Sequence, residues 1–257
     1  MRNFIGIDIG STCAKTIVMD EQGNITQRIL QPTGWSSVET AKSIAKELAE
    51  RGIDVEKEYV VATGYGRVAV PYADKCITEI TCHGRGGSIL HGEKDLVLID
   101  IGGQDTKIVQ VQDGSVVDFL MNDKCAAGTG RFMEVMANTL AMDAKEMCEL
   151  AREGKDTSIS SLCTVFAESE VISLIGRGES RANIAFAIID SIASKVVSQA
   201  GHINRRNMPV CITGGLCDYE YLCESLGKKL GTQVLTKEDG RYAGAIGAAS
   251  FALEKGK

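Results

Sequence analysis

No stretch of the 257-residue chain is apolar over eighteen or more residues, which argues against a membrane-spanning helix. Basic residues are not in excess either. The 28 Lys and Arg stand against 34 Asp and Glu, a net charge of −6 that is atypical of a general nucleic-acid binder. The first residues, MRNFIGIDIGS, lead directly into a strand-like segment and lack the long apolar region of a secretory signal. We therefore expect a cytoplasmic protein that binds neither membranes nor nucleic acid.

Common metal and redox patterns are missing as well. No C-x-x-C pair occurs, which disfavours a zinc ribbon and a thioredoxin-type site. The three histidines, His83, His91 and His202, are widely spaced, and we expect core or surface positions for them. Nine cysteines are many for this length, but their odd number and the expected reducing compartment disfavour a disulfide framework.

An internal repeat organises the chain. Residues 5–25, IGIDIGSTCAKTIVMDEQGNI, align with residues 97–116, VLIDIGGQDTKIVQVQDGSV, so that Asp8 matches Asp100. Each copy predicts an apolar strand, a polar glycine turn, a second strand, another glycine turn and a third strand. The repeat predicts an α/β protein with two similar lobes and a nucleotide-binding cleft between them.

Helical periodicity follows each copy. In residues 37–51 one face is predicted from Val38, Ala41, Ala45 and Leu48, with Gly52 placed to end the helix. In residues 130–141 the corresponding face is formed by Phe132, Val135, Met136 and Leu140. We place the first lobe at residues 1–94, with the C-terminal segment 241–257 packed back on it, and the second lobe at 95–240.

The turn after the first strand of each copy is suited to bind phosphate. Gly10 lets the backbone approach a ligand, the hydroxyls of Ser11 and Thr12 can donate hydrogen bonds, and Lys15 adds positive charge. A third glycine turn, CITGGL (211–216), also follows an apolar strand. The predicted nucleotide contacts are Gly10, Ser11, Thr12, Cys13, Ala14 and Lys15 in the first lobe, Gly102, Gly103, Gln104 and Asp105 in the second, and Gly214 and Gly215 in the third glycine turn.

Asp8 and Asp100 are the predicted catalytic residues. Each ends an apolar strand, where a carboxylate can hold hydrated Mg²⁺ or orient an attacking water. Another glycine stretch, TGYGR (63–67), lacks the third glycine and the setting of a dinucleotide fingerprint, so we do not expect a Rossmann site there.

The stretch NDKCAAGTGRF (122–132) places Cys125 before small residues and glycines. Such residues ahead of an amphipathic run are typical of a helix N-terminus that another group approaches closely. Taken alone, the residues leave three alternatives for Cys125: a small buried side chain, a thiol nucleophile, or a ligand of a bulky group.

Together, GIDIGST, LIDIGGQDTK, ITGGL and the small-residue segment AGAIGAA (243–249) resemble the acetate and sugar kinase, heat-shock ATPase and actin superfamily, which has duplicated ribonuclease H-like lobes. MNDKCAAGTGRF and SSLCTVFAESEVISL further resemble signatures of the ATP-dependent activators of 2-hydroxyacyl-CoA dehydratases, a family that includes ATPase subunits of benzoyl-CoA reductase. The resemblance implies an oxygen-sensitive, homodimeric ATPase that uses ATP and Mg²⁺ and holds one [4Fe-4S] cluster between its subunits. It also implies ferredoxin or flavodoxin as electron donor, and a dehydratase or reductase with its own clusters as acceptor of a low-potential electron.

Within this resemblance, Cys125 and Cys163 are the expected cluster ligands. Such clusters take four thiolates, and two per chain become four across a two-fold axis. Because the cluster is anionic, we also expect the A-A-G-T-G run after Cys125 to leave helix N–H groups free to face it.

For the other cysteines we expect mainly structural positions. Cys148 and Cys211 are predicted to be buried in the core. Cys76 and Cys82, which flank ITEIT, are also predicted to be core residues rather than metal ligands. The even spacing of Cys211, Cys217 and Cys223 leaves a second cluster as an alternative.

Two other classes of function remain open. A small-molecule kinase of the sugar-kinase type would need a base near a substrate hydroxyl, and would have no need of Cys125 and Cys163. A regulatory ATPase of the actin or chaperone kind would hydrolyse ATP slowly without redox chemistry, and would be colourless and indifferent to oxygen.

Overall fold

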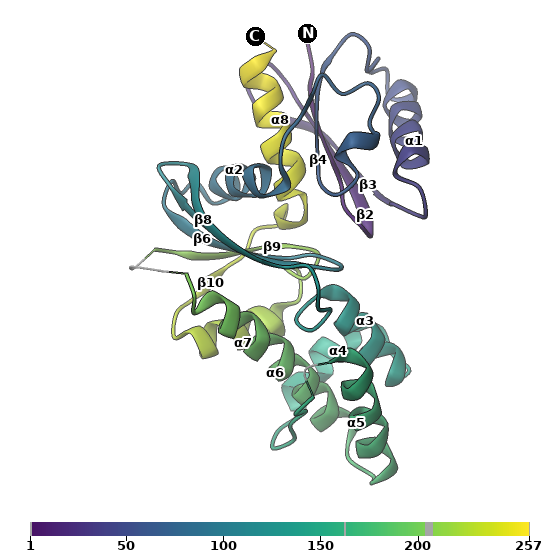
Figure 1. Ribbon diagram of the computed structural model, residues 1–257, viewed down its shortest axis with the longest axis vertical. Coiled ribbons are helices and arrows are strands. Elements are labelled where there is room, and N and C mark those ends of the chain that lie inside the picture. Colours follow the sequence, from purple (N-terminus) through teal and green to yellow (C-terminus); the bar gives the residue numbers. More distant parts are fainter. Residues whose placement is uncertain (1, 162, 204–207, 257) are drawn as a thin grey trace. The chain divides into compact units, whose positions relative to one another are not determined.

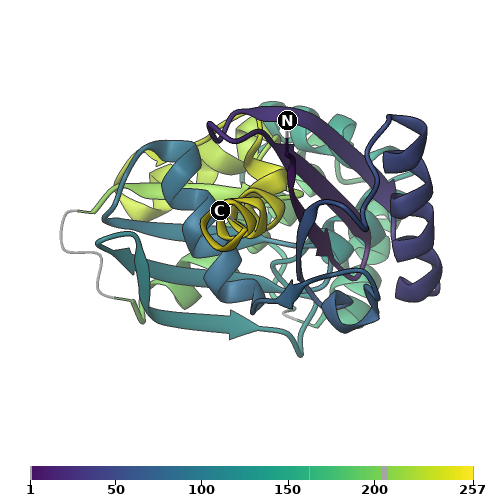
Figure 2. The ribbon, with the colours of Figure 1, turned by 90° about the horizontal axis from the view of Figure 1, so that it is seen from above.

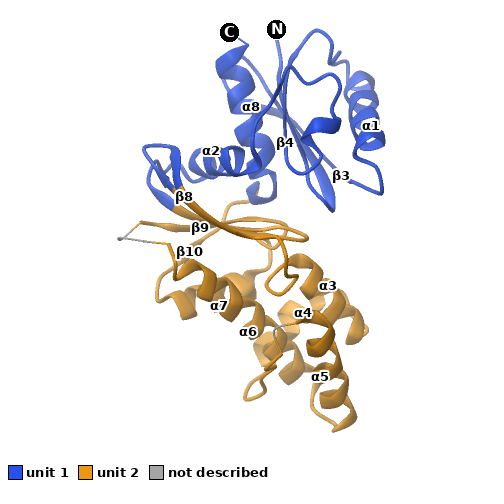
Figure 3. Ribbon diagram, viewed as in Figure 1, with its two compact units in different colours: residues 1–96, 111–117, 239–257 blue, residues 97–110, 118–238 orange. Residues whose placement is uncertain are grey.

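The computed structural model describes residues 2–161, 163–203 and 208–256. The chain divides into two compact units, one of residues 1–96, 111–117 and 239–257 and the other of residues 97–110 and 118–238 (Figure 3). Among the described residues, no helix combines the length and apolar character needed to cross a membrane.

The first unit is built on a five-stranded sheet with strand order β3-β2-β1-β4-β5 (Figure 1). The central strand β1 pairs antiparallel with β2 and parallel with β4. The elements of this unit are β1 (Phe4–Ile9), β2 (Cys13–Met19), β3 (Ile25–Pro32), α1 (Ser37–Glu50), β4 (Tyr59–Thr63), the 3-10 helix η1 (Arg67–Ala69), β5 (Lys75–Cys76), α2 (Glu79–His91), the 3-10 helix η3 (Gly240–Tyr242) and α8 (Ala243–Lys255).

Helix α1 covers one face of this sheet. The Ser36 side chain caps it by accepting from the Glu39 N–H, and Gly52, with φ of +81°, follows its last turn. The predicted helix is therefore confirmed, but its buried face differs from the predicted one. Ile44 is buried whereas Val38 is exposed, because the face that packs against the sheet is centred on Ala41, Ile44 and Leu48.

Helix α8 packs on the first unit through its small residues, and lies beside α2 in Figure 2. A Cβ added at Gly6 of β1 would lie 2.1 Å from the Ala245 carbonyl oxygen, and one at Gly86 of α2 would lie 1.8 Å from that of Ala243. These backbones can approach so closely only because both positions are glycine. The small-residue run in α8 thus holds both β1 and α2 close against this helix.

The second unit repeats the first, with strand order β10-β9-β6-β7-β8 and the same parallel pairing of β6 with β9 and of β9 with β10. The repeat predicted from the sequence is confirmed. The remaining elements are β6 (Leu96–Ile101), β7 (Thr106–Gln112), β8 (Ser115–Asn122), α3 (Gly130–Thr139), α4 (Ala144–Leu150), the 3-10 helix η2 (Ala151–Glu153), α5 (Thr164–Gly176), α6 (Arg181–Ala200), β9 (Val210–Gly214), α7 (Glu220–Leu230) and β10 (Val234–Leu235).

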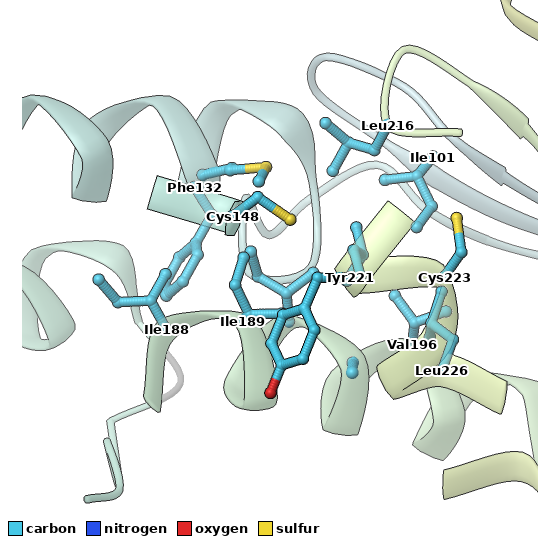
Figure 4. Packing of buried hydrophobic residues seen from close by; sticks show 14 of the residues in the cluster. Ile101, Phe132, Cys148, Ile188, Ile189, Val196, Leu216, Tyr221, Cys223 and Leu226 are labelled. Carbon is cyan, nitrogen blue, oxygen red and sulfur yellow. The ribbon is translucent and has the colours of Figure 1, made fainter. Parts of the chain in front are cut away.

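The core of the second unit lies between one face of its sheet and its helices (Figure 4). Phe132 of α3, Ile188 of α6 and Leu226 of α7 meet Ile101 of β6 there. The residues of β6 alternate between the faces of the sheet, so Asp100 points away from this core. Asp8 in β1 likewise follows the core residue Ile7.

Candidate functional site

The two aspartates that end β1 and β6 have matching neighbours. Asp8 lies opposite Lys15 on β2 and opposite Thr63 on β4. Asp100 lies opposite Thr213 on β9 and forms an ion pair with Lys107 of β7. Each unit therefore places a carboxylate between a lysine and a threonine at the end of its central strand.

A glycine follows the threonine in both units. Gly64 and Gly214 have φ of +83° and +87°, which favour glycine, and both press against the end of the central strand. A Cβ at Gly64 would lie 2.3 Å from Asp8 Oδ1, and one at Gly214 would lie 2.3 Å from the Ile101 carbonyl oxygen. The start of TGYGR is thus the counterpart of ITGG, a match that the sequence comparison missed.

Asp8 also lies against residues of the two helices α2 and α8. Its Oδ2 lies 3.8 Å from His83 Nε2 on α2, and this imidazole lies 3.8 Å from Glu79 Oε1. A Cβ at Gly244 of α8 would lie 2.7 Å from both Asp8 Oδ2 and His83 Nε2. His83 is thus a core histidine beside the predicted catalytic carboxylate, and its spacing of four residues from Glu79 on a helix was the available signal.

Asp100 is held differently. Lys107, whose side chain is 1% exposed, lies 3.4 Å from Asp100 Oδ2 and 2.7 Å from Asp105 Oδ1. Asp100 Oδ1 accepts a 2.8 Å hydrogen bond from the Thr213 hydroxyl. Both oxygens of Asp100 are therefore engaged by donors of its own unit. The repeat pointed to Lys107, but it was not among the predicted site residues.

The glycine turn after the first strand of each unit is closed by an equivalent backbone hydrogen bond. The Gly10 N–H donates to the Cys13 carbonyl at 3.1 Å, and the Gly102 N–H donates to the Asp105 carbonyl at 2.9 Å. In the first turn the side chains of Ser11 and Thr12 are exposed. In the second, Gly103 is partly exposed and Gln104 is exposed.

Two predicted nucleotide contacts can act only through their backbones, and a third faces open space. The Ala14 side chain is packed in the core and cannot reach a ligand. Position 214 must be glycine because its backbone lies directly against β6. In contrast, no atom lies within 4 Å of a Cβ built at Gly215, so this position is open to a ligand.

The two predicted cluster cysteines both lie in the second unit, each ahead of a helix. Cys125 is half-buried in the loop before α3, and its carbonyl accepts a 2.8 Å hydrogen bond from Asn122 Nδ2. Cys163 is exposed and is the N-cap residue of α5. Leu162, inside the SSLCTVF signature, lies outside the described residues.

The prediction of free N–H groups after Cys125 is wrong for the start of α3. The Gly130 N–H donates to the Gly102 carbonyl at 2.9 Å, and the Arg131 N–H donates to the Gly103 carbonyl at 2.8 Å. These amides are occupied by the second phosphate-sized turn and do not face outward. Gly130 is needed because two backbones meet here.

The other cysteines are mostly buried, as predicted for Cys148, Cys211 and Cys82. Cys217 and Cys223 are buried too. The prediction for Cys76 is wrong. Its side chain is exposed, because β5 is a two-residue strand at the edge of the first sheet. Within the described part of this single chain, no three or more His, Cys, Asp or Glu side chains group as a metal site.

Comparison with known proteins shows which family this chain is similar to. A family model described as the BadF/BadG/BcrA/BcrD ATPase family matches residues 5–252. The (R)-2-hydroxyglutaryl-CoA dehydratase activating ATPase of Acidaminococcus fermentans is 40% identical over 254 residues, covering 98% of this chain and 97% of that protein.

Solved structures agree. The A. fermentans (R)-2-hydroxyglutaryl-CoA dehydratase component A superimposes with a TM-score of 0.92 at 38% identity, over 99% of both chains. The activator of 2-hydroxyisocaproyl-CoA dehydratase from Clostridium difficile, with bound ADPNP, gives 0.90 at 35% identity over 98% of this chain and 95% of that chain. A glucokinase from Streptomyces griseus gives 0.61 at 17% identity over 98% and 99%, and shows the wider superfamily fold alone. The resemblance found in the sequence is thereby confirmed: the chain belongs to the BadF/BadG/BcrA/BcrD ATPase family.

Proposed function

We propose that this protein is an ATP-driven electron-transfer activator. Two copies of the chain hold one [4Fe-4S] cluster through Cys125 and Cys163 of each, and ATP hydrolysis drives a low-potential electron to a partner iron–sulfur enzyme. The observation that carries the proposal is the position of Cys163, which is an exposed thiol at the N-cap of α5 in a chain whose other cysteines are mostly buried. Similar proteins are named as dehydratase activators, which favours a dehydratase or related reductase as the partner.

Cysteine chemistry and helix position both suit the cluster. An N-cap thiolate lies beside the first N–H groups of its helix, which have no partner within the helix and favour negative charge. The first turn of α5 carries no acidic residue that would oppose an anionic group. When bound, the cluster supplies a one-electron redox centre, and Cys125 and Cys163 of this chain supply half of its four thiolates.

Helix α5 offers a surface for the second copy of the chain. Its inner face is buried through Ala167 and Val171, yet Val165, Phe166 and Ile172 are also exposed. A helix that is apolar on both sides is usually covered on both. Since Cys163 begins this same helix, a two-fold axis beside its N-terminus would pair the exposed faces and bring two Cys163 thiolates together.

The nucleotide is assigned to the glycine turns. Gly10, Ser11 and Thr12 in the first unit and Gly103 and Gln104 in the second can offer N–H and hydroxyl donors to phosphate. The acid side chains suit Mg²⁺, a cation that prefers oxygen ligands and keeps part of its water shell. Asp8 is the carboxylate assigned to hold a water of that shell or the attacking water.

Coupling between ATP and the electron obeys thermodynamic linkage. ATP changes the electron affinity of the protein only as far as it binds one conformation better than another. A tenfold preference corresponds to about 59 mV for one electron, so a modest preference already shifts the potential usefully.

Substitution of the carboxylates tests the proposal. Asp8→Asn and Asp100→Asn should each lower ATP hydrolysis by orders of magnitude while leaving the iron content of anaerobically purified protein nearly unchanged. Asp54→Asn, in an exposed pair with Lys57, is the matched control and should retain full activity. Unaltered turnover in both Asp8 and Asp100 variants would refute the nucleotide assignment. ATP-dependent phosphorylation of a small alcohol by colourless protein would favour a kinase instead.

A further inference from the structure

The turn Gly102–Thr106 and the segment Cys125–Arg131 are joined backbone to backbone. Besides the bonds from the Gly130 and Arg131 N–H groups to the turn carbonyls, the Thr106 hydroxyl donates to the Gly128 carbonyl at 2.7 Å. The Thr106 side chain is fully buried. Three hydrogen bonds thus connect the proposed phosphate turn of the second unit to the residues that directly follow Cys125.

The turn and the segment are also packed closely against each other. A Cβ at Gly130 would lie 3.2 Å from the Gly102 carbonyl oxygen and 3.4 Å from Gly103 Cα. Gly128 has φ of +83°, and a Cβ there would lie 3.0 Å from Lys195 Cγ on α6. A larger residue at Gly130 would press on the turn, so this glycine permits the close contact between the two segments, whereas Gly128 permits close packing of the segment on α6.

The loop between Cys125 and the joint is also held. The Thr129 hydroxyl and N–H both donate to the Ala126 carbonyl, at 2.6 and 3.0 Å. Asn122 Nδ2 donates to the Cys125 carbonyl on the other side. A displacement of the turn is therefore passed on to the Cys125 backbone through short, bonded steps and not through a flexible linker.

From these contacts we infer that the turn Gly102–Thr106 and the segment Cys125–Arg131 move as one piece, with Thr106 as the positioning residue that joins them. This inference rests on the proposed function, which places nucleotide at the turn and the cluster at Cys125. It adds the route by which the nucleotide sets the position of Cys125. Thr106 touches neither group, and acts through the Gly128 carbonyl.

Hydrogen–deuterium exchange resolved to short peptides tests this route in the anaerobically purified protein, with and without Mg²⁺ and a non-hydrolysable ATP analogue at saturation. In the wild type, nucleotide should slow exchange in residues 102–106 and in residues 125–131, each by about fivefold or more, as expected for coupled sites. In Thr106→Val, which keeps the shape and removes the hydroxyl, protection of 102–106 should remain and that of 125–131 should fall clearly below the wild-type value, because one of the three connecting hydrogen bonds is lost.

Matched variants separate the joint from general loss of structure. Thr139→Val removes a hydroxyl that donates to the Val135 carbonyl within α3, and should behave as wild type. Thr106→Ser keeps the hydroxyl and should restore the effect. Gly130→Ala breaks the joint from the other side and should reproduce the loss seen in Thr106→Val, which covers the case in which that variant folds poorly.

Each result has one meaning. Nucleotide protection of 102–106 in the wild type without protection of 125–131 would overturn this inference and leave the proposed ATPase intact. Full protection of 125–131 in folded Thr106→Val would also overturn it. Absence of protection in both segments of the wild type would instead refute the nucleotide assignment in the proposed function, and the inference with it.

Discussion

Lys107 and Asp100 form a buried ion pair at the end of β6, with Lys107 Nζ 3.4 Å from Asp100 Oδ2 and side-chain exposures of 1% and 2%. The same ammonium lies 2.7 Å from Asp105 Oδ1. One buried lysine thus contacts two carboxylates, Asp100 in β6 and Asp105 in the turn that follows it. The repeat makes Asp8 and Asp100 equivalent in sequence, but Asp8 lies beside His83. Lys107 thereby links Asp100 of β6 to Asp105 of the second turn.

Replacing the lysine should destabilise the fold. Lys107→Met leaves buried negative charge without its cation, a change that typically costs about 3–5 kcal/mol. Chemical denaturation of the wild type and variant would measure the loss. In Lys107→Met/Asp100→Asn the combined loss should be smaller than the sum of the single losses, because the residues interact directly.

Lys42→Met is the control for that substitution. Lys42 pairs with Glu39 on the exposed face of α1, so its loss should change the free energy of unfolding by less than about 0.5 kcal/mol. Equal effects of Lys107→Met and Lys42→Met would contradict the assignment of Lys107 as a buried counter-ion.

Much of the fold was predictable, because the repeat shows that the same strand-and-turn pattern occurs twice and so predicts two similar units. The alternation in IGIDIG and VLIDIG predicted the central strands, and the two glycine turns predicted how each next strand returns. Gly52 predicted the end of α1 for a local reason, namely its left-handed backbone. Signals of this kind depend on a few neighbouring residues and are visible in one sequence.

What was missed depends on contacts between distant segments. His83 comes to Asp8 where α2 and α8 pack through glycines, and the spacing of Glu79 and His83 on one helix does not by itself report that approach. The use of the Gly130 amide by the Gly102 carbonyl was missed for the same reason. Cys76 was misjudged because burial of a cysteine depends on whether its strand lies at the edge of the sheet.

A charge on the exposed face of α5 should weaken the proposed dimer. Ile172→Glu places a carboxylate where we expect apolar packing against a second copy, whereas the isolated chain tolerates it because the position is 57% exposed. Sedimentation of anaerobic protein should show a shift from dimer to monomer. Val68→Glu, at an 83% exposed position of the first unit, is the control and should remain dimeric. Dimers of undiminished stability in Ile172→Glu would exclude α5 from the interface.

The buried thiol of Cys148 should make the stability of the protein fall at alkaline pH. Burial raises the pKa of Cys148 to about 11 from the ordinary value of 9.0. The folded state therefore keeps this proton where the unfolded chain loses it, so the contribution to stability is full below pH 9 and is lost as the pH rises to about 11. Cys148→Ala should cost some stability at neutral pH but show a shallower decline over this window, by about 1 kcal/mol per pH unit.

Cys76→Ala is the matched control for the alkaline experiment, since Cys76 is exposed. Its stability should decline with pH as steeply as that of the wild type in denaturation titrations. A decline in Cys148→Ala that parallels the wild type would show that this thiol titrates alike in the folded and unfolded states.

Iron content, measured together with chain mass in anaerobically purified protein, tests the central claim most directly. Four thiolates from two chains on one cluster predict four irons per dimer, or two per chain. Cys125→Ala and Cys163→Ala should each abolish the cluster, because the two-fold axis removes two of four ligands at once. ATP should still bind to both variants, and buried Cys148→Ala should keep iron near the wild-type value. Four irons per chain, or iron retained without Cys125 or Cys163, would contradict the account.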